Sequence, residues 1–177
     1  MSQIKENAMS ELVYLRSLEM ADLERCYQWH NDPELYLFLG NSFRHVSQKA
    51  EEAWLESKVG WHHNEINLAI CLAESHQHIG NIYLRDIDWI SRRAELHIFI
   101  GDKTQRSKGC GQSAIRQLVR YAFDELGLQR VFLFVLEDNL AARHSYKKCG
   151  FNVEGTLLRH VFKNGQFKNM IIMGLCK

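Results

Sequence analysis

The stretch "QRSKGCGQSAIRQLVRYAF" (residues 105–123) joins a basic loop containing two glycines to a segment with helical periodicity. Apolar residues recur there at the spacing of one helix face, and the set is Ile115, Leu118, Val119, Ala122, Phe123 and Leu126. We therefore predict a helix from Ala114 that ends at Gly127. The first turn of a helix presents unpaired backbone N–H groups and a partial positive charge, so the loop before it is a candidate anion site.

Gly109 and Gly111 keep side chains away from that first turn, and Arg106 and Lys108 add positive charge, which favours a phosphate or pyrophosphate ligand. The loop is not a P-loop, because it lacks the Gly-Lys-Ser/Thr end. It is not the dinucleotide fingerprint either, because Ala114 stands where the third glycine is required. Taken alone, the two glycines could equally form a plain left-handed turn that enters a helix.

The remaining chain shows alternating strand and helix patterns. Strands are expected at 12–16, 66–73, 79–87, 92–101 and 130–137, the last apolar enough to be covered on both faces, and in two C-terminal runs joined by a turn at Asn164 and Gly165. Helices are expected from Leu23 to a stop at 31–33, from the N-cap Ser47 through Trp61, and from Asn139 to a stop at Gly150.

This order of elements predicts an α+β fold, with a mainly antiparallel, twisted sheet of about seven strands and helices on both faces. The chain of 177 residues contains one proline and no low-complexity linker, so we expect residues 1–177 to form a single domain with a loose segment at 1–10.

The formal net charge of +1 gives no overall attraction to nucleic acid or to a membrane surface, and no window is apolar enough for a membrane span. We expect a cytoplasmic protein with no nucleic-acid or membrane partner. Its five cysteines contain no C-x-x-C pair, which favours reduced thiols. Cys110, at a helix N-terminus beside cations, is the thiol expected to be reactive.

Three motifs together resemble the GNAT (general N-acetyltransferase) superfamily: R-x-x-G-x-G in "RSKGCG", N-x-x-A-x-x-x-Y in "NLAARHSY", and the Gly-Phe pair at 150–151. The segments "RRAELHIFI" and "VFKNGQFKN" resemble the branch of ribosomal-protein N-terminal and spermidine N-acetyltransferases, most closely its spermidine enzymes. The resemblance covers nearly the whole chain. It implies acetyl-CoA as the cosubstrate, no metal, and a central strand pair that splays apart between 98–100 and 131–136.

The resemblance also implies which residues contact the cosubstrate. The pyrophosphate would bind the N–H groups around Lys108 to Gln112, and the pantetheine arm would hydrogen-bond the strand at Ile98 to Ile100. The implied cofactor-binding set is Ile98, Phe99, Ile100, Arg106, Lys108, Gly109, Cys110, Gly111, Gln112, Ser113, Asn139 and Tyr146. Asn139 is equally suited to cap its helix.

Acetyl transfer requires a neutral amine and protonation of the departing thiolate. An alkyl amine is neutral in only about one molecule in 10³ at pH 7, so a base is needed. Glu95 is the first candidate, and the alternative is that it only pairs with Arg92, Arg93 or another cation. His97, two residues further on the same strand face, is the second candidate.

Tyr146 matches the family position of the general acid, and the alternative is that it only packs under the cosubstrate. Ser145 is rotated by about 100° on the helix and does not share its direction. A covalent acetyl-Cys110 intermediate is disfavoured, because the loop already has phosphates to bind. The histidine pairs 62–63 and 76–78 lack a third metal ligand at a recognisable spacing.

The leading acceptor is a polyamine such as spermidine, which requires spaced carboxylates. Candidate carboxylates in the two-helix region are Asp32, Glu34, Glu51, Glu52 and Glu56. The loop "LGNSFRHV" (39–46) lacks the acidic run that spermidine enzymes typically carry. A protein N-terminus or an amino sugar remains an alternative acceptor, and a non-catalytic acyl-CoA sensor or a generic nucleotide-binding protein remains an alternative class. The exposed C-terminal hairpin edge favours a homodimer.

Overall fold

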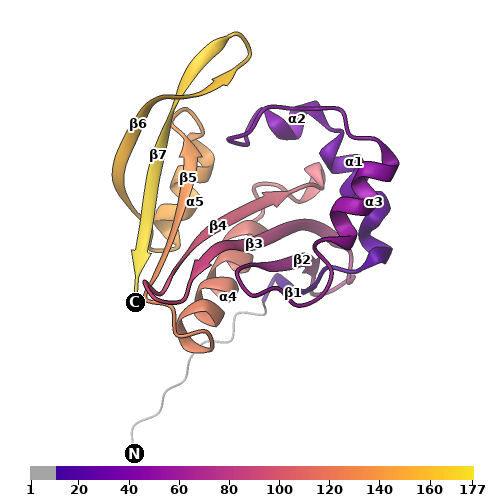
Figure 1. Ribbon diagram of the computed structural model, residues 1–177, viewed down its shortest axis with the longest axis horizontal. Helices are drawn as coiled ribbons and strands as arrows, with labels where there is room; N and C mark the ends of the chain where they lie inside the picture. The colour runs from indigo at the N-terminus through magenta and orange to yellow at the C-terminus, as the bar shows by residue number, and fades with distance from the viewer. Residues whose placement is uncertain (1–10) are drawn as a thin grey trace, which may run out of the picture.

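The computed structural model describes residues 11–177, so the expected loose segment 1–10 lies outside the described residues. Figure 1 shows the arrangement of the elements. The strands are β1 (Val13–Ser17), β2 (Ile66–Leu72), β3 (His78–Asp88), β4 (Arg93–Ile100), β5 (Arg130–Leu136), β6 (Asn152–Lys163) and β7 (Gln166–Cys176). The helices are α1 (Leu23–His30), α2 (Pro33–Tyr36), α3 (Gln48–Glu56), α4 (Cys110–Asp124) and α5 (Leu140–Lys148), with short 3-10 turns at Met20–Asp22 and Lys103–Gln105.

The strands form one sheet in the order β1-β2-β3-β4-β5-β7-β6. Every neighbouring pair is antiparallel except β4 and β5, which run parallel. The predicted mainly antiparallel sheet of seven strands is therefore confirmed.

Helices cover both faces of this sheet, as expected. On one face, α4 packs on a core that includes Leu96 of β4 and Leu133 of β5, and Tyr146 of α5 packs against the same core. On the other face, α1 and α3 contribute Cys26 and Leu55 to a second core. Side chains of a strand alternate between faces, so Glu95, His97 and Phe99 lie on the α1/α3 face.

The parallel pair of β4 and β5 is short. Its ladder joins only residues 93–95 to 130–132, and the two strands then diverge (Figure 1). We call this divergence the split, lined by residues 96–100 of β4 and 133–136 of β5. The splayed central strand pair that the resemblance implied is confirmed.

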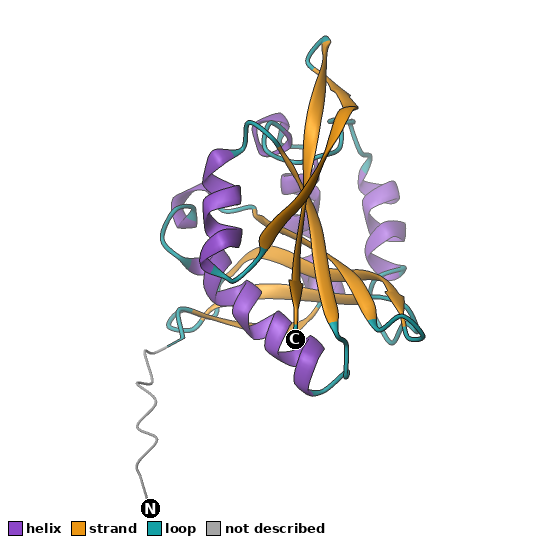
Figure 2. Cartoon of the chain, turned by 90° about the vertical axis from the view of Figure 1, so that its left-hand side faces the viewer, coloured by secondary structure: helices purple, strands orange, loops and turns teal. Residues whose placement is uncertain are grey.

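The C-terminal hairpin turns at Asn164 and Gly165, whose φ values of 50° and 77° fit the predicted two-residue turn. β6 and β7 extend past the rest of the sheet in Figure 2. Gly150 ends α5 with a φ of 95°, also as predicted. No helix within residues 11–177 is long and apolar enough to cross a membrane.

Four local predictions need correction. Trp61 lies beyond the end of α3 and is 85% exposed, because the helix ends at Glu56 and glycine follows at position 60. The long helix α4 begins at Cys110 rather than Ala114 and ends at Asp124. The chain forms the short helix α2 from Pro33, inside the predicted stop at 31–33, because Asp32 accepts a hydrogen bond from the Glu34 N–H and Pro33 stands in the first turn. β5 is not covered on both faces, since Phe132 and Phe134 on the α1/α3 face are only half-buried.

Candidate functional site

The edge of β4 that faces the split carries unpaired backbone groups. Gly101 N–H donates to the Ile79 carbonyl on the β3 side (2.9 Å), and the Arg92 carbonyl accepts from Gln129 at the start of β5 (2.7 Å). Backbone groups of successive strand residues point to opposite edges, so those of Ile98 and Ile100 point toward β5. The β4–β5 ladder has ended at these positions, so this edge is open to an extended ligand that carries amide groups.

Arg106 connects this edge to the glycine loop. Its Nε donates to the Ile100 carbonyl (2.9 Å) and its Nη2 to the Gly101 carbonyl (3.2 Å). The guanidinium therefore fixes the end of β4, which leaves both polar groups of Ile98 and the N–H of Ile100 facing the split. Its predicted contact with a phosphate stays a prediction.

The loop before α4 has the backbone shape of an anion site. Ser107 and Gly109 have φ values of 62° and 88°, and Gly109 is the N-cap of α4 with no side-chain cap. The first N–H groups of the helix are thus left for another acceptor. A Cβ at Gly111 would meet only Ile100 and Ile98 side-chain atoms, at 3.9 and 4.0 Å, so the protein's own packing does not require glycine there. Lys108 is exposed beside this turn.

The prediction of a reactive Cys110 is wrong. The residue is 4% exposed and packs in the core under α4. Burial raises the pKa of its thiol, and this effect outweighs the opposite influence of the helix N-terminus and of Lys108. The side chain of Cys110 therefore packs in the core under α4 and is not exposed to a reactant.

Glu95 and His97 contact each other on the α1/α3 face. His97 Nε2 lies 2.9 Å from Glu95 Oε1, and their side chains are 39% and 17% exposed. Glu95 is also the last rung of the β4–β5 ladder, opposite Phe132, so it stands where the split begins. The alternative pairing with Arg92 or Arg93 is not found among residues 11–177, and Arg93 instead lies 3.7 Å from Asp88.

Tyr146 lies on the opposite face of the sheet from Glu95. It packs against the core of α4 and against Phe151, with ring centroids 6.1 Å apart. Burial raises the pKa of Tyr146 to about 12, so its hydroxyl stays protonated at neutral pH. A single ligand could contact both Tyr146 and Glu95 only at the split, where the sheet is open between its two faces.

Asn139 has both ends of its amide engaged within the protein. Its Oδ1 accepts from Ala142 N–H (3.1 Å), which confirms the expected cap of α5. Its Nδ2 donates to the Phe38 carbonyl (3.1 Å). Its predicted contact with the cosubstrate stays untested.

A bridge between the loop after α2 and the β6–β7 hairpin could not be expected from any local pattern in the sequence. Lys163 Nζ donates to the carbonyls of Leu39 (2.9 Å) and Asn41 (2.7 Å), and Ser42 Oγ donates to the Phe162 carbonyl (3.1 Å). Lys163 is 7% exposed, and burial lowers the pKa of its ammonium. We call these contacts the loop–hairpin bridge; they join segments more than 100 residues apart.

The five candidate acids are not gathered at one place. Asp32 and Glu34 both pair with Lys103, at 3.4 and 2.6 Å, and Glu51 is buried against His30 (2.8 Å). Glu52 and Glu56 are exposed on α3.

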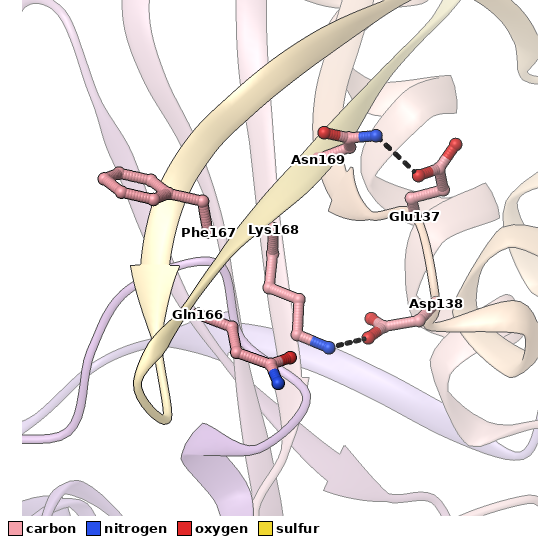
Figure 3. Close-up of a pocket in the computed structure, with 6 residues that line it drawn as sticks. All are labelled: Glu137, Asp138, Gln166, Phe167, Lys168 and Asn169. Carbon is pink, nitrogen blue, oxygen red and sulfur yellow. Dashed lines mark hydrogen bonds and ion pairs between the residues drawn. The ribbon is translucent and has the colours of Figure 1, made fainter.

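A different acidic pair lines a cavity of about 310 Å³ between the end of β5 and β7 (Figure 3). Asp138 accepts a hydrogen bond from Lys168 Nζ (2.7 Å), and Glu137 accepts one from Asn169 (2.9 Å). The Lys168 ammonium lowers the pKa of Asp138, so this carboxylate is ionised and already holds an ammonium group. Both carboxylates are visible in the sequence, since "LED" stands at the end of the strand. They lie outside the two-helix region, where the acids that bind the acceptor were expected.

Comparison with known proteins adds a family. The acetyltransferase (GNAT) domain model matches residues 13–152. The spermidine N(1)-acetyltransferase of Escherichia coli is 31% identical over 164 residues, which cover 91% of this chain and 84% of that protein.

Two solved structures of the Vibrio cholerae spermidine N-acetyltransferase are similar. One, in complex with CoA and spermine, has a TM-score of 0.85 and 27% identity and covers 93% of this chain and 95% of that chain. The other is dodecameric, in an intermediate state, with a TM-score of 0.78 and 28% identity, and covers 93% of this chain and 94% of that chain.

Proposed function

The chain belongs to the acetyltransferase (GNAT) family, and from this premise we propose that it transfers an acetyl group from acetyl-CoA to a primary amine by direct attack. The observation that carries the proposal is the split. It places an open β4 edge beside the uncapped N-terminus of α4, and Glu95 stands where the two strands part.

Acetyl-CoA supplies the activated thioester, and the chain's own residues fit it. The open N–H and carbonyl of Ile98 and the open N–H of Ile100 suit the amides of the pantetheine arm. The N–H groups of the first turn of α4, with Lys108 and Arg106 nearby, suit the pyrophosphate. The proposed cosubstrate-binding set is Ile98, Phe99, Ile100, Arg106, Lys108, Gly109, Cys110, Gly111, Gln112, Ser113, Asn139 and Tyr146.

The proposed catalytic residues are Glu95 and Tyr146. Glu95 takes a proton from the acceptor ammonium through a water molecule, which makes the amine a nucleophile. A backbone N–H among residues 98–100 stabilises the charge that develops on the thioester oxygen. Tyr146 donates a proton to the departing thiolate, for which a protonated phenol is suited.

A polyamine such as spermidine is the leading acceptor. The E. coli relative and the V. cholerae structure are both named for this substrate class. Asp138 supports it as well, because it already binds the ammonium of Lys168, and Glu137 provides a second carboxylate in the same cavity. A protein N-terminus, an amino sugar and a non-catalytic sensor remain the alternatives that the assay must separate.

We also propose that the whole chain is one acetyltransferase domain and that it forms a homo-oligomer. Large apolar side chains are exposed on the hairpin, among them Leu158 (76%), Phe162 (57%) and Phe167 (53%). The V. cholerae relative has been solved as a dodecamer. Light scattering on the purified protein tests this, and a monomer at micromolar concentration would exclude it.

The deciding experiment measures thiol release from acetyl-CoA with spermidine, short peptides beginning with Ser or Ala, amino sugars and aminoglycosides. Release with spermidine at low concentration supports the proposed acceptor. Faster release with another class names that class instead. CoA binding without release from any amine would favour the sensor.

A further inference from the structure

We propose that His97 is a proton-relay residue, which passes to solvent the proton that Glu95 removes from the amine. The proposal rests on the function proposed above and adds a residue and a route to it. It starts from the Glu95–His97 contact of 2.9 Å between Oε1 and Nε2.

The positions of the two side chains fit a relay that runs outward. Glu95 is 17% exposed and stands where the split begins, so a bound acceptor would cover it further. His97 is 39% exposed, and no hydrogen bond to its Nδ1 is found among residues 11–177. One ring nitrogen therefore faces the carboxylate, and the other remains available to water.

Other groups on this face do not replace His97 as the partner of Glu95. Arg85 lies opposite Glu95 in the β3–β4 ladder, and its guanidinium is 4.9 Å from the ring centroid of Tyr83. No ion pair of Arg85 is found in the described part of the chain. Tyr83 lies opposite His97 and is buried, and on β5 the neighbour of Glu95 is Phe132.

Two further histidines approach the face through aromatic contacts only. His30 of α1 contacts Phe99, with ring centroids 6.0 Å apart, and is itself paired with Glu51 of α3. His160 of β6 stacks on Phe134 at 6.4 Å. Neither contact reaches the Glu95 carboxylate, so His97 is the imidazole placed to exchange a proton with it.

The proton balance of the reaction shows how many protons the relay must carry. An ammonium acceptor loses two protons on becoming an amide, and the thiolate takes up one, so one proton leaves per turnover. The first proton passes from the ammonium to Glu95 and then, over the 2.9 Å contact, to the unprotonated Nε2 of His97, while the hydrogen on Nδ1 leaves to water. The ring returns to its Nδ1–H tautomer before the next turnover. The second leaves the nitrogen as the carbon–sulfur bond breaks and replaces the one that Tyr146 gives to sulfur.

An imidazole suits this step better than a second carboxylate would. In reference compounds a proton is held about 100-fold more tightly by imidazole than by a glutamate side chain. A Glu–His pair therefore pulls a proton from an ammonium more strongly than an isolated carboxylate does, and imidazole exchanges protons with water readily near pH 7.

The kinetic test replaces His97 with Gln, which can still hydrogen-bond to Glu95 but cannot carry a proton. We expect His97→Gln to lower kcat/KM for the amine at pH 7 by about 10-fold or more, and added imidazole to restore part of the rate. The control is His63→Gln, because His63 is exposed and lies outside the site. This variant should keep the wild-type rate, and added imidazole should not change that rate. A His97→Gln variant with the wild-type pH profile and no response to imidazole would overturn the relay.

A second measurement needs no acceptor, so it separates failure of the relay from failure of the proposed function. The relay requires a neutral His97 ring that carries its hydrogen on Nδ1, because Nε2 must be unprotonated to accept the proton from Glu95. The ¹⁵N NMR spectrum of the labelled protein identifies this tautomer, and we expect it in the wild type. A neutral ring protonated on Nε2 refutes the relay, whether or not any amine is acetylated.

Discussion

Tyr146 lies on the opposite face of the sheet from Glu95 and keeps its hydroxyl protonated at neutral pH, and we propose it as the proton donor to the leaving group. Replacing it with Phe removes the hydroxyl and leaves the ring packed against Phe151. We expect kcat to fall by about 100-fold while the Kd for CoA changes little. Thiol release and calorimetric CoA binding measure the two quantities, and an unchanged kcat would remove Tyr146 from the mechanism.

Asp22 stabilises the fold through a buried network on the α1/α3 face. It is 4% exposed, accepts two hydrogen bonds from Arg16 (2.7 and 2.8 Å), and lies 3.0 Å from His78 Nδ1. Burial alone would raise the pKa of this carboxyl, but the bonds from Arg16 and His78 outweigh it and hold the pKa below its usual range. We expect Asp22→Asn to lower the free energy of unfolding at pH 7 by roughly 3 to 5 kcal/mol, because the Arg16 guanidinium loses its carboxylate partner.

The pH dependence of the same group follows from the direction of its shift. A carboxyl whose folded pKa is depressed contributes stability above its unfolded pKa of about 3.9, and this contribution is lost as pH falls through the folded value. Urea midpoints of the wild type should therefore decrease below about pH 4 more steeply than those of Asp22→Asn. Equal slopes for the two proteins would contradict the assignment.

At the scale of elements, α4 supplies the test of the anion site. A side chain at Gly111 has room within the protein, so we expect Gly111→Val to fold and yet to weaken CoA binding by about 10-fold or more, because the added methyl groups stand beside the open β4 edge. The control is Gly127→Ala, just past the other end of α4. There φ is 67° and a Cβ meets nothing within 4 Å, so it should cost about 1 kcal/mol of stability and leave CoA affinity unchanged.

Gly109 differs from Gly111, since its φ of 88° makes any side chain strained. A substitution there would disturb the loop itself and would mix a stability effect with a binding effect. Calorimetry on Gly111→Val and Gly127→Ala separates the effect on CoA binding from the effect on stability. If both variants bind CoA as the wild type does, the account of this turn is wrong.

At the scale of the whole molecule, the loop–hairpin bridge joins the helical region to the C-terminal hairpin across the open end of the sheet. Lys163→Met removes the two hydrogen bonds to the carbonyls of Leu39 and Asn41 and keeps an apolar side chain of similar length. We expect KM for the amine to rise several-fold and KM for acetyl-CoA to stay within a factor of two. Glu154→Gln is the matched control, because it removes the ion pair with Arg130 on the same hairpin without touching this loop. A change in KM for acetyl-CoA alone would show that the bridge does not serve the acceptor side.

Much of the fold was predictable because its signals are local. The spacing of apolar residues predicted α1, α3 and α4, alternation predicted β2, β3 and β4, and Gly150 and Gly165 marked turns that require positive φ. The boundaries were less accurate. The sequence could not show that α4 starts at Cys110 or that Trp61 lies off α3, because backbone hydrogen bonds at helix ends depend on the neighbouring loops.

The sequence by itself determined the elements, the order that makes one α+β sheet, the motifs of the family, and the placement of Glu95 and His97 on one strand face. Only the tertiary structure decided which side chains meet. It buried Cys110 and so removed its reactivity, gave Glu95 a histidine partner in place of an arginine, and joined Lys163 to Leu39, 124 residues away. The physical reason is that periodicity is read within a few residues of the chain, whereas burial, ion pairing and the position where two strands part depend on packing between distant segments.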